Sequence, residues 1–267
     1  MAAPHLKAVV STKRPVIEIA GVSKTYRTQD GDVPSLRPLD FSVGEGEFLV
    51  VVGPSGCGKS TLLKLIAGLL PPSDGEIRVE GRVVTKPHAG VGIVFQSPLL
   101  LPWRSVFRNV MMPVEVKGLP RGEYEARARA LIKMVGLVGF ENKYPWQLSG
   151  GMQQRASICR ALVHDPQIVL MDEPFGALDA MTRERMNVEL QRIQRETGKT
   201  VLLITHSIPE AVFLADRVLV MTERPGAIAA IYDVTLPKPR SLDVLADPEF
   251  VRLTQTIRRH FDVRQDL

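Results

Sequence analysis

The stretch that decides the fold of this chain is Gly53-Pro54-Ser55-Gly56-Cys57-Gly58-Lys59-Ser60-Thr61. The residues before it, 48–52, are apolar and mostly β-branched, which predicts a buried strand. Residues 62–66 after it carry an apolar face that is compatible with a helix. A glycine-rich turn between a strand and a helix, with the pattern G-x-x-x-x-G-K-[ST], is typical of a phosphate-binding loop.

The residue types in this loop suit an anionic ligand. Glycines let the backbone curl so that successive N–H groups point at phosphate oxygens, and the helix adds its positive N-terminal end. Lys59 is expected to reach the β- and γ-phosphates, and the Ser60 hydroxyl to take one position on Mg²⁺. The alternative is an ordinary glycine-rich turn with a solvated lysine. The flanking strand and helix favour an ATP or GTP site.

Length and composition limit the possible classes of protein. A chain of 267 residues, 45% hydrophobic and 24% charged, fits one large α/β domain or one domain with an inserted subdomain. No segment reaches the roughly 18 apolar residues that a membrane helix needs, and no secretory leader is expected. Cys57 and Cys159 give neither a disulfide framework nor a metal-ligand spacing, which fits a reducing cytosol. The net charge of +5 does not discriminate nucleic acid from a membrane surface.

The domain organisation is predicted from changes in amino-acid composition along the chain. Residues 1–15 are expected to be a disordered lead-in, and residues 241–267 a helical tail whose helix starts at Asp247. Prolines at 98, 102, 113 and 120 are expected to break the chain, and residues 123–135 read as a helix. Residues 97–160 are therefore predicted to be a mostly helical insertion. Strands are expected at 16–19, 22–26, 76–79, 91–95, 168–173, 201–204, 217–221 and 228–234, and further helices at about 150–162 and 182–197.

Two carboxylates end the apolar strand predicted at residues 168–173. Charge at the carboxyl edge of a parallel sheet lies where open α/β sheets bind ligands. Asp172 in this place is suited to Mg²⁺, usually through water. Glu173 is suited to polarise a water aimed at the γ-phosphate. The alternative, a surface acidic pair, fits poorly because the strand is so apolar and Pro174 follows directly.

Ser149-Gly150-Gly151 forms a second predicted anion-binding helix start, far from the first in sequence. Ser149 is a suitable N-cap, and the glycines allow close approach to backbone N–H groups. The alternative is a capped helix with a flexible entry.

Three single residues stand at positions where a ligand is possible. Gln96 and His206 each end a predicted strand, and Tyr26 lies ahead of the phosphate loop. Taken alone, Gln96 reads as a polar strand end, His206 as a structural histidine, and Tyr26 as a half-buried sheet tyrosine. Placement of His206 at the same edge as Asp172 favours contact with phosphate, and Tyr26 is able to stack on a purine.

Together these motifs resemble one family, the ATP-binding subunits of ATP-binding-cassette (ABC) transporters. Residues 53–61 match the Walker A loop, 168–173 the Walker B strand and 148–154 the signature motif. Gln96 matches the Q-loop, Ala177-Leu178-Asp179 the D-loop, His206 the switch histidine and Tyr26 the adenine-stacking aromatic. The resemblance covers about residues 16–235. It implies an α/β P-loop fold over 16–240 with a mixed sheet core, an N-terminal antiparallel β portion and the inserted helical subdomain.

The resemblance also implies a mechanism. Two copies face each other head to tail, and each ATP lies between the Walker A loop of one and the Ser149-Gly150-Gly151 turn of the other. Lys59, Ser60, Asp172 and Gln96 hold MgATP, with Ser60, Gln96 and Asp172 on the metal side. Glu173 acts as general base and His206 contacts the γ-phosphate. Tyr26 contacts the base, and Asp179 makes contacts across the dimer.

Similarity to the bacterial nitrate/sulfonate/taurine importer subfamily follows from Gln96-Ser97-Pro98, Leu100-Leu101-Pro102-Trp103, Phe175-Gly176, Arg224-Pro225-Gly226 and Leu236-Pro237. It implies a homodimer that lies at the cytoplasmic face of the membrane and drives a separate permease. An extracytoplasmic solute-binding protein is an indirect partner, and nucleic acid is not expected as one. The solute is expected to be a small oxyanion or organosulfur compound. Residues 99–103 are expected either to pack inside the insertion or to form a docking lip for the permease.

Other readings predict different partners or chemistry. An importer ATPase for another small solute is the nearest alternative. A soluble cassette ATPase of DNA repair or translation usually has two cassettes or a long coiled-coil insertion, and neither is visible here. A module that only binds nucleotide is disfavoured by Lys59, Glu173 and His206.

Because Cys57 lies inside the phosphate loop, a thiol reagent is expected to block ATP hydrolysis there.

Overall fold

The computed structural model describes residues 13–176 and 178–261, which form two compact units. Unit 1 comprises the chain up to His88 and again from Ile204 onward, and unit 2 comprises Ala89–Leu203. The predicted disordered lead-in falls outside the described residues except for positions 13–15. The predicted domain limits remain predictions.

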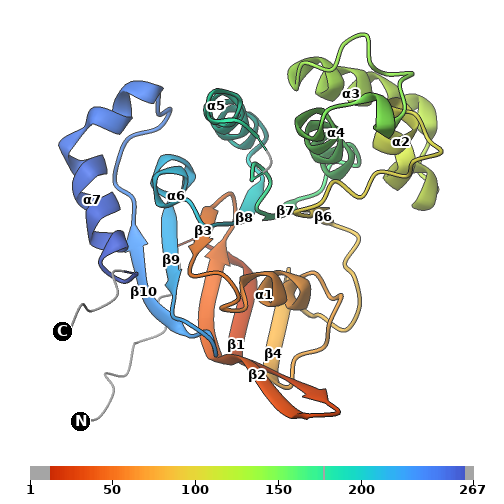
Figure 1. Cartoon of the computed structure of the whole chain (residues 1–267). Coiled ribbons are helices and arrows are strands. Elements are labelled where there is room, and N and C mark those ends of the chain that lie inside the picture. The colour runs from red at the N-terminus through yellow and green to blue at the C-terminus, as the bar shows by residue number, and fades with distance from the viewer. Residues whose placement is uncertain (1–12, 177, 262–267) are drawn as a thin grey trace, which may run out of the picture. The chain divides into compact units, whose positions relative to one another are not determined.

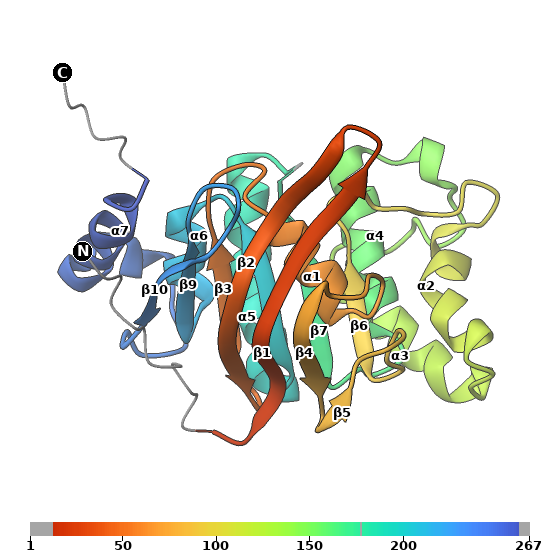
Figure 2. The same ribbon diagram turned by 90° about the horizontal axis from the view of Figure 1, so that it is seen from below.

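Unit 1 contains an antiparallel sheet with the strand order β2-β1-β4-β5, in which β1 and β2 are long paired strands (Figure 2). Its strands are β1 (Pro15–Thr28), β2 (Gly31–Gly44), β4 (Asp74–Val79) and β5 (Arg82–Val83). Two separate strands were predicted where β1 runs continuously. The register of β1 against β2 shifts between Ile19 and Val22, where Gly21 adopts a left-handed φ of 60°. This bulge explains the apparent break in the sequence pattern.

Unit 1 also contains the strand that leads into the phosphate loop. This strand, β3 (Phe48–Val52), pairs in parallel with β9 (Arg217–Met221), and β10 (Ile228–Asp233) pairs with β9 in the antiparallel sense. Every residue of β3 and β9 is buried, as expected for strands covered on both faces. The predicted mixed sheet core and the predicted N-terminal antiparallel β portion are confirmed.

Three helices complete unit 1. Helix α1 (Lys59–Ile66) follows the phosphate loop and contacts β2 and β4. Helix α6 (Ile208–Leu214) contacts β3, and α7 (Pro248–Arg258) packs on α6 after the short helix η2 (Leu242–Ala246) (Figure 1). Asp247 caps α7 as predicted, since its Oδ1 accepts from Glu249 N at 2.7 Å.

Unit 2 joins parallel strands to a group of helices. Strand β6 (Val91–Val94) pairs in parallel with β7 (Ile168–Asp172). Helix α5 (Ala180–Thr197) ends at Gly198, which has the left-handed φ of 64° typical of a C-terminal cap. Strand β8 (Thr200–Thr205) follows it, and its last two residues belong to unit 1.

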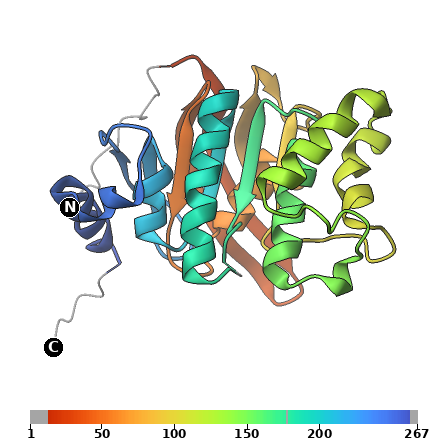
Figure 3. The same cartoon turned by 90° about the horizontal axis from the view of Figure 1, so that it is seen from above.

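The remaining helices of unit 2 form the yellow and green group in Figure 3: α2 (Val106–Val116), α3 (Arg121–Met134), η1 (Pro145–Gln147) and α4 (Gly150–Leu162). The expectation that Pro113 breaks the chain is wrong, because Pro113 lies inside α2. Burial of Val110, Met111 and Val114 offsets the hydrogen bond that proline removes. Sequence pattern alone also missed α2.

None of the helices formed by residues 13–176 and 178–261 is long and apolar enough to cross a lipid bilayer.

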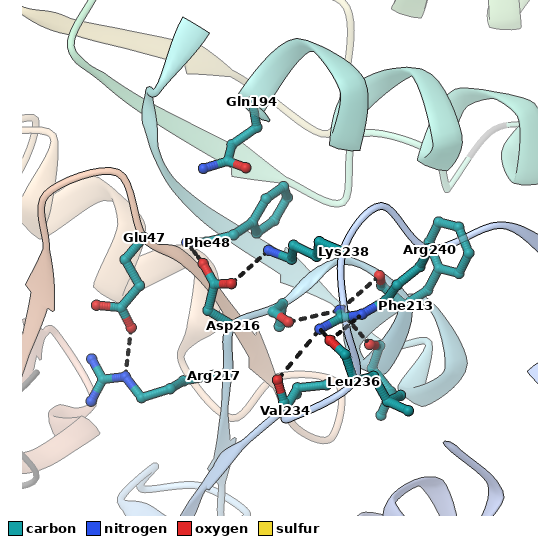
Figure 4. Close-up of polar contacts among 12 residues, drawn as sticks. Glu47, Phe48, Gln194, Phe213, Asp216, Arg217, Val234, Leu236, Lys238 and Arg240 are labelled. Atoms are coloured by element: carbon teal, nitrogen blue, oxygen red, sulfur yellow. Dashed lines mark hydrogen bonds and ion pairs between the residues drawn. The ribbon is translucent and has the colours of Figure 1, made fainter. Parts of the chain in front are cut away.

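Buried arginines tie the segments of unit 1 together (Figure 4). Arg217 Nε lies 2.5 Å from Glu47 Oε1, and Arg217 also donates to Ser42 O at 2.6 Å. Arg240, 3% exposed, donates to backbone carbonyls at the end of α6 and after β10: Val212, Phe213, Ala215, Val234 and Leu236. Burial lowers the pKa of Arg240 to about 10. One side chain thus caps the C-terminus of α6 and fixes the segment that leads to the tail.

We expect Arg240→Ala to lower the free energy of unfolding by about 3 kcal/mol, because it leaves several buried carbonyls without donors. The shift of the urea midpoint measures this loss. Arg252→Ala is the matched control, since the exposed Arg252 forms an ion pair with Glu249 one turn away on α7 and its removal should leave the midpoint unchanged. Equal midpoints for the two variants would contradict the role given to Arg240.

Candidate functional site

The phosphate loop depends on glycine at two positions of left-handed backbone. Gly56 has a φ of 76°, and Gly58, which precedes the first residue of α1, has a φ of 106°. A methyl group at Gly58 would also lie 2.6 Å from Leu36 Cδ2. The loop therefore curls as the sequence predicted, and the first turn of α1 follows it with N–H groups that have no acceptor within the helix.

Lys59 lies inside this curl. It is 6% exposed, and its Nζ donates to Gly53 O at 2.7 Å and to Pro54 O at 2.8 Å. The ammonium group is thereby held within the loop, where it adds a positive charge to the oriented N–H groups. This arrangement suits a polyphosphate.

The loop between β9 and β10 packs against the phosphate loop. A methyl group at Gly226 would lie 2.1 Å from Cys57 O, so only glycine fits there. Gly226 N donates to Ser35 O at 2.9 Å, and Arg37 N donates to Gly226 O at 2.9 Å. In the sequence, Arg224-Pro225-Gly226 carries only a subfamily resemblance and does not predict this supporting role.

Tyr26 lies next to the helix that follows the phosphate loop. The hydroxyls of Tyr26 and Thr61 are 3.2 Å apart, and Lys24 Nζ lies 5.5 Å from the ring centroid. The half-buried ring thus belongs to the surroundings of the loop, and a role as base-stacking residue stays a prediction.

His206 shares a cavity with the start of the phosphate loop. This His206 cavity, of about 590 Å³, is lined by residues 53–55 and His206, and also by His260 and Phe261 near the end of the tail helix. The exposed His206 lies in a turn that two hydrogen bonds fix: Thr205 Oγ1 donates to Glu210, and Ser207 N donates to Thr205 Oγ1 at 3.0 Å. Neither tail residue was predicted as part of the site, because nothing in the local sequence places the end of this helix near the phosphate loop.

Unit 2 carries the predicted carboxylates at the end of β7. Asp172 is 7% exposed. Glu173 has a left-handed φ of 45°, a conformation that non-glycine residues rarely adopt. Gln96 Nε2 donates to Glu173 Oε2 at 3.4 Å. Gln96 and Glu173 are thus brought together, although they are far apart in sequence.

The second predicted anion-binding turn is exposed. Ser149 and Gly150 are both exposed, and Ser149 caps α4 by accepting from Met152 N at 3.3 Å. A methyl group at Gly151 would lie 2.8 Å from Leu178 Cδ2, which explains the second glycine. The signature turn and the D-loop therefore pack together within unit 2.

Asp179 is the N-cap of α5. Its Oδ1 accepts from Thr182 N at 3.0 Å, and the hydrogen bonds from Thr182 lower the pKa of this exposed carboxyl group. Asp179 is therefore ionised at neutral pH. Ala177 of the same motif lies outside the described residues.

Helix α4 also holds the chain on both sides of Gln96. Gln154 Nε2 donates to Phe95 O at 3.1 Å. Arg160 donates to Pro98 O and Leu99 O, each at 2.7 Å. A displacement of the segment after Gln96 therefore involves the helix that begins with the signature turn.

The residues expected around a metal ion offer oxygen donors only. Ser60 belongs to unit 1, and Gln96 and Asp172 belong to unit 2. Within the described part of the chain, no three His, Cys, Asp or Glu side chains gather as a metal cluster. A hydroxyl, an amide oxygen and a carboxylate are each donor types that Mg²⁺ accepts, and this ion keeps several waters and needs few protein ligands.

Comparison with known proteins gives the family. The ABC transporter model matches residues 36–176. An uncharacterized ABC transporter ATP-binding protein of Methanocaldococcus jannaschii is 50% identical over 224 residues, which are 84% of each chain. The taurine import ATP-binding protein TauB of Rhizobium johnstonii is 47% identical, covering 88% of this chain and 92% of its own. TauB of Escherichia coli is 42% identical, with 88% and 94% covered.

Solved structures agree with these matches. A dimeric bacterial ABC transporter cassette has a TM-score of 0.76 and 33% identity. A dimeric post-hydrolysis cassette bound to ADP and Pi has a TM-score of 0.75 and 32% identity, and both matches cover 83% of this chain and 100% of the other. The chain belongs to the ABC transporter family. Within that family it is an ATP-binding subunit that hydrolyses ATP.

The thiol chemistry expected of Cys57 does not fit its position. Cys57 is 0% exposed, and burial raises its pKa despite the opposing charge of Lys59. Its Sγ lies 2.9 Å from where a methyl group on Gly53 would be. A buried thiol with a raised pKa is rarely in the reactive thiolate form and reacts slowly. We therefore expect that a thiol reagent does not block ATP hydrolysis through Cys57, which reverses the expectation from the sequence.

We expect N-ethylmaleimide to leave ATP hydrolysis by the native protein nearly unchanged over a time that labels the unfolded protein at Cys57 and Cys159. Mass spectrometry of the labelled chain and phosphate release measure the two effects. Rapid inactivation that ATP prevents and that Cys57→Ser abolishes would contradict this burial argument.

Proposed function

We propose that this chain is the ATP-hydrolysing subunit of an importer for a small sulfonate or oxyanion, with taurine as the first candidate. The observation that carries this proposal is the similarity to taurine import ATP-binding proteins, 41–47% identical over most of the chain. The permease is a separate protein and the solute-binding protein lies outside the membrane. The ATPase subunit attaches to the permease as a peripheral protein on the cytoplasmic side.

Two copies of the chain form the working enzyme. The exposed Ser149 and Gly150 begin a helix whose positive end suits an anion. In the proposed head-to-tail dimer, this turn meets the terminal phosphate of an ATP held by Lys59 of the other copy. Each site then uses one anion-binding helix start from each chain, and Asp179 contacts the opposite copy. The dimeric cassettes among the structural neighbours support this arrangement.

Glu173 is the proposed general base. Its carboxylate accepts from Gln96, and its left-handed backbone holds the side chain directly after β7. Backbone strain of this kind is typical of functional positions. Glu173 takes the proton of a water that attacks the γ-phosphate, while Lys59 and His206 stabilise the charge on the phosphate oxygens. Mg²⁺, when held by Ser60, Gln96 and Asp172, neutralises charge on the phosphates. Tyr26 stacks on the adenine.

The segment 99–103 is the proposed contact with the permease. Leu99 is 57% exposed and Trp103 is 70% exposed. The fully buried Asn109 fixes the segment, because its Nδ2 donates to the carbonyls of Leu101, Arg104 and Ser105 and its Oδ1 accepts from Leu101 N. An apolar loop that is held rigid while its large side chains face solvent is suited to bind an apolar helix. Its link to α4 through Arg160 connects this surface to the signature turn.

The proposed activity is tested in vesicles that contain the chain, its permease and the solute-binding protein. We expect taurine to stimulate phosphate release, and Glu173→Gln to lower it about 100-fold or more by loss of the general base. This variant should still bind ATP and dimerise. Glu184→Gln, at an exposed position of α5, is the matched control and should hydrolyse ATP normally.

Near-normal hydrolysis by Glu173→Gln would remove Glu173 from the role of base. Stimulation by nitrate or another solute, and not by taurine, would support the role as an importer subunit but assign it a different substrate. No stimulation by any solute, with co-purification on a soluble partner, would favour a cassette ATPase outside transport.

We expect Trp103→Ala to weaken binding to the permease by about 2 kcal/mol, or roughly thirtyfold in Kd, if this exposed ring is a central contact. Its basal ATP hydrolysis and its thermal midpoint should not change. Val116→Ala, at a site 78% exposed at the end of α2, is the control. Unchanged permease affinity in Trp103→Ala would place the docking surface elsewhere.

A further inference from the structure

Two buried polar side chains lie in the turn that carries His206. The His206 side chain is exposed, whereas Thr205 is 2% exposed and Glu210 is 6% exposed. All three belong to unit 1. A buried hydroxyl or carboxylate group costs free energy unless hydrogen bonds satisfy it. The proposed hydrolysis gives neither Thr205 nor Glu210 a role, so their burial beside His206 needs a physical explanation.

The Thr205 hydroxyl joins the backbone on the two sides of His206. Ser207 N donates to Thr205 Oγ1 at 3.0 Å. This contact closes a turn of the kind that serine and threonine form with the backbone N–H two residues further on. His206 lies at the centre of the turn. The direction in which its side chain leaves the backbone therefore depends on one hydroxyl group.

Glu210 fixes the orientation of that hydroxyl group. The Thr205 oxygen accepts from Ser207 N, and its own proton is donated to Glu210 Oε2. A hydrogen bond from a hydroxyl to a carboxylate is stronger than one between two neutral groups. The carboxylate thus holds Thr205 in the rotamer that keeps the turn closed.

These contacts extend a familiar way of capping a helix. Ser207 and Glu210 are spaced as in a capping box, and the Ser207 side chain caps α6 by accepting from Glu210 N at 3.4 Å. In this chain the glutamate also reaches Thr205, which lies two residues before the N-cap. The capping interaction therefore encloses His206, which a capping box alone would leave outside.

Helix α6 anchors Glu210 to the strand that carries the phosphate loop. The last five residues of α6, 210–214, are all buried, and α6 contacts β3, which ends directly before Gly53. Packing against β3 therefore sets the position of the Glu210 carboxylate. The hydrogen bond to Thr205 relates the turn around His206 to this fixed position.

We propose that Thr205 and Glu210 are positioning residues, which hold His206 in the direction needed for contact with the terminal phosphate of ATP. The proposal rests on the proposed function, in which His206 stabilises charge on the phosphate oxygens. Both residues act through the imidazole. A small displacement of a group that stabilises a transition state lowers the rate steeply. Loss of the hydrogen bond between Thr205 and Glu210 therefore lowers kcat and has little effect on the KM for ATP.

The test removes or keeps the hydroxyl group at position 205 in the full chain. Thr205→Val keeps the branched shape of the side chain and removes the hydroxyl, whereas Thr205→Ser keeps the hydroxyl. Thr256→Val is the matched control, because Thr256 Oγ1 donates to Arg252 O at 2.8 Å within α7 and its loss does not touch the turn. Far-UV circular dichroism and the thermal midpoint check the fold of each variant.

We expect Thr205→Val to lower kcat about tenfold, with the KM for ATP within about twofold of the wild-type value. Thr205→Ser and Thr256→Val should both keep kcat within about twofold of the wild-type value. Glu210→Ala should lower kcat as Thr205→Val does, because the hydroxyl then has no carboxylate to hold it.

A double-mutant cycle separates positioning from a merely structural role. Added to His206→Ala, Thr205→Val should cost no further activity, because the side chain that Thr205 positions is already gone. A structural role would lower kcat by the same factor with and without His206. Release of radiolabelled phosphate over hours measures the low rates of the His206→Ala variants.

Hydrogen exchange measures the turn without hydrolysis. The Ser207 amide should exchange about tenfold faster in Thr205→Val than in the wild-type chain or in Thr205→Ser, because its acceptor is lost. Unchanged kcat in folded Thr205→Val, or an equal loss with and without His206, would overturn the proposal. If the wild-type chain does not hydrolyse ATP, the proposed function fails instead. Exchange at Ser207 still decides in that case whether Thr205 holds the turn.

Discussion

The curled backbone of the phosphate loop is the constraint on which the rest of the site depends. Gly58 adopts a left-handed conformation against Leu36, and Gly226 touches the carbonyl of Cys57 with no room for a side chain. Lys59 closes the loop from inside through the carbonyls of Gly53 and Pro54. Backbone contacts therefore fix the direction of the N–H groups before any ligand arrives, which is the condition for tight anion binding without reorganisation.

The second half of the proposed chemistry is organised in the same manner. Helix α4 begins at the exposed signature turn and holds the chain before Gln96 through Gln154 and after it through Arg160. Gln96 in turn hydrogen bonds to the strained Glu173. The proposed base, the signature turn and the proposed permease contact are thus linked by hydrogen bonds within one unit, so that a movement imposed at one of them has a physical path to the others.

Motifs whose residue types directly indicate a chemistry could be predicted from the sequence. The contacts between distant segments that support these motifs could not. The strand–loop–helix around Lys59, the cap at Ser149 and the strand that carries Asp172 follow from local periodicity and chemistry, and the structure has them. Helix α2 was missed because Pro113 opposes a helix locally, while burial of its apolar face decides the outcome. The support from Gly226 and the approach of His260 arise from segments far apart in sequence, and a single sequence carries no signal for such contacts.

The central claim is that one ATP is held by two copies of the chain, with Lys59 from one and Ser149 from the other. Its most direct test is the structure of Glu173→Gln with MgATP. The account predicts a head-to-tail dimer in which the Ser149 hydroxyl of the partner subunit lies within hydrogen-bonding distance, roughly 3 Å, of a γ-phosphate oxygen. A nucleotide bound by residues of a single copy, with both signature turns facing solvent, would contradict it.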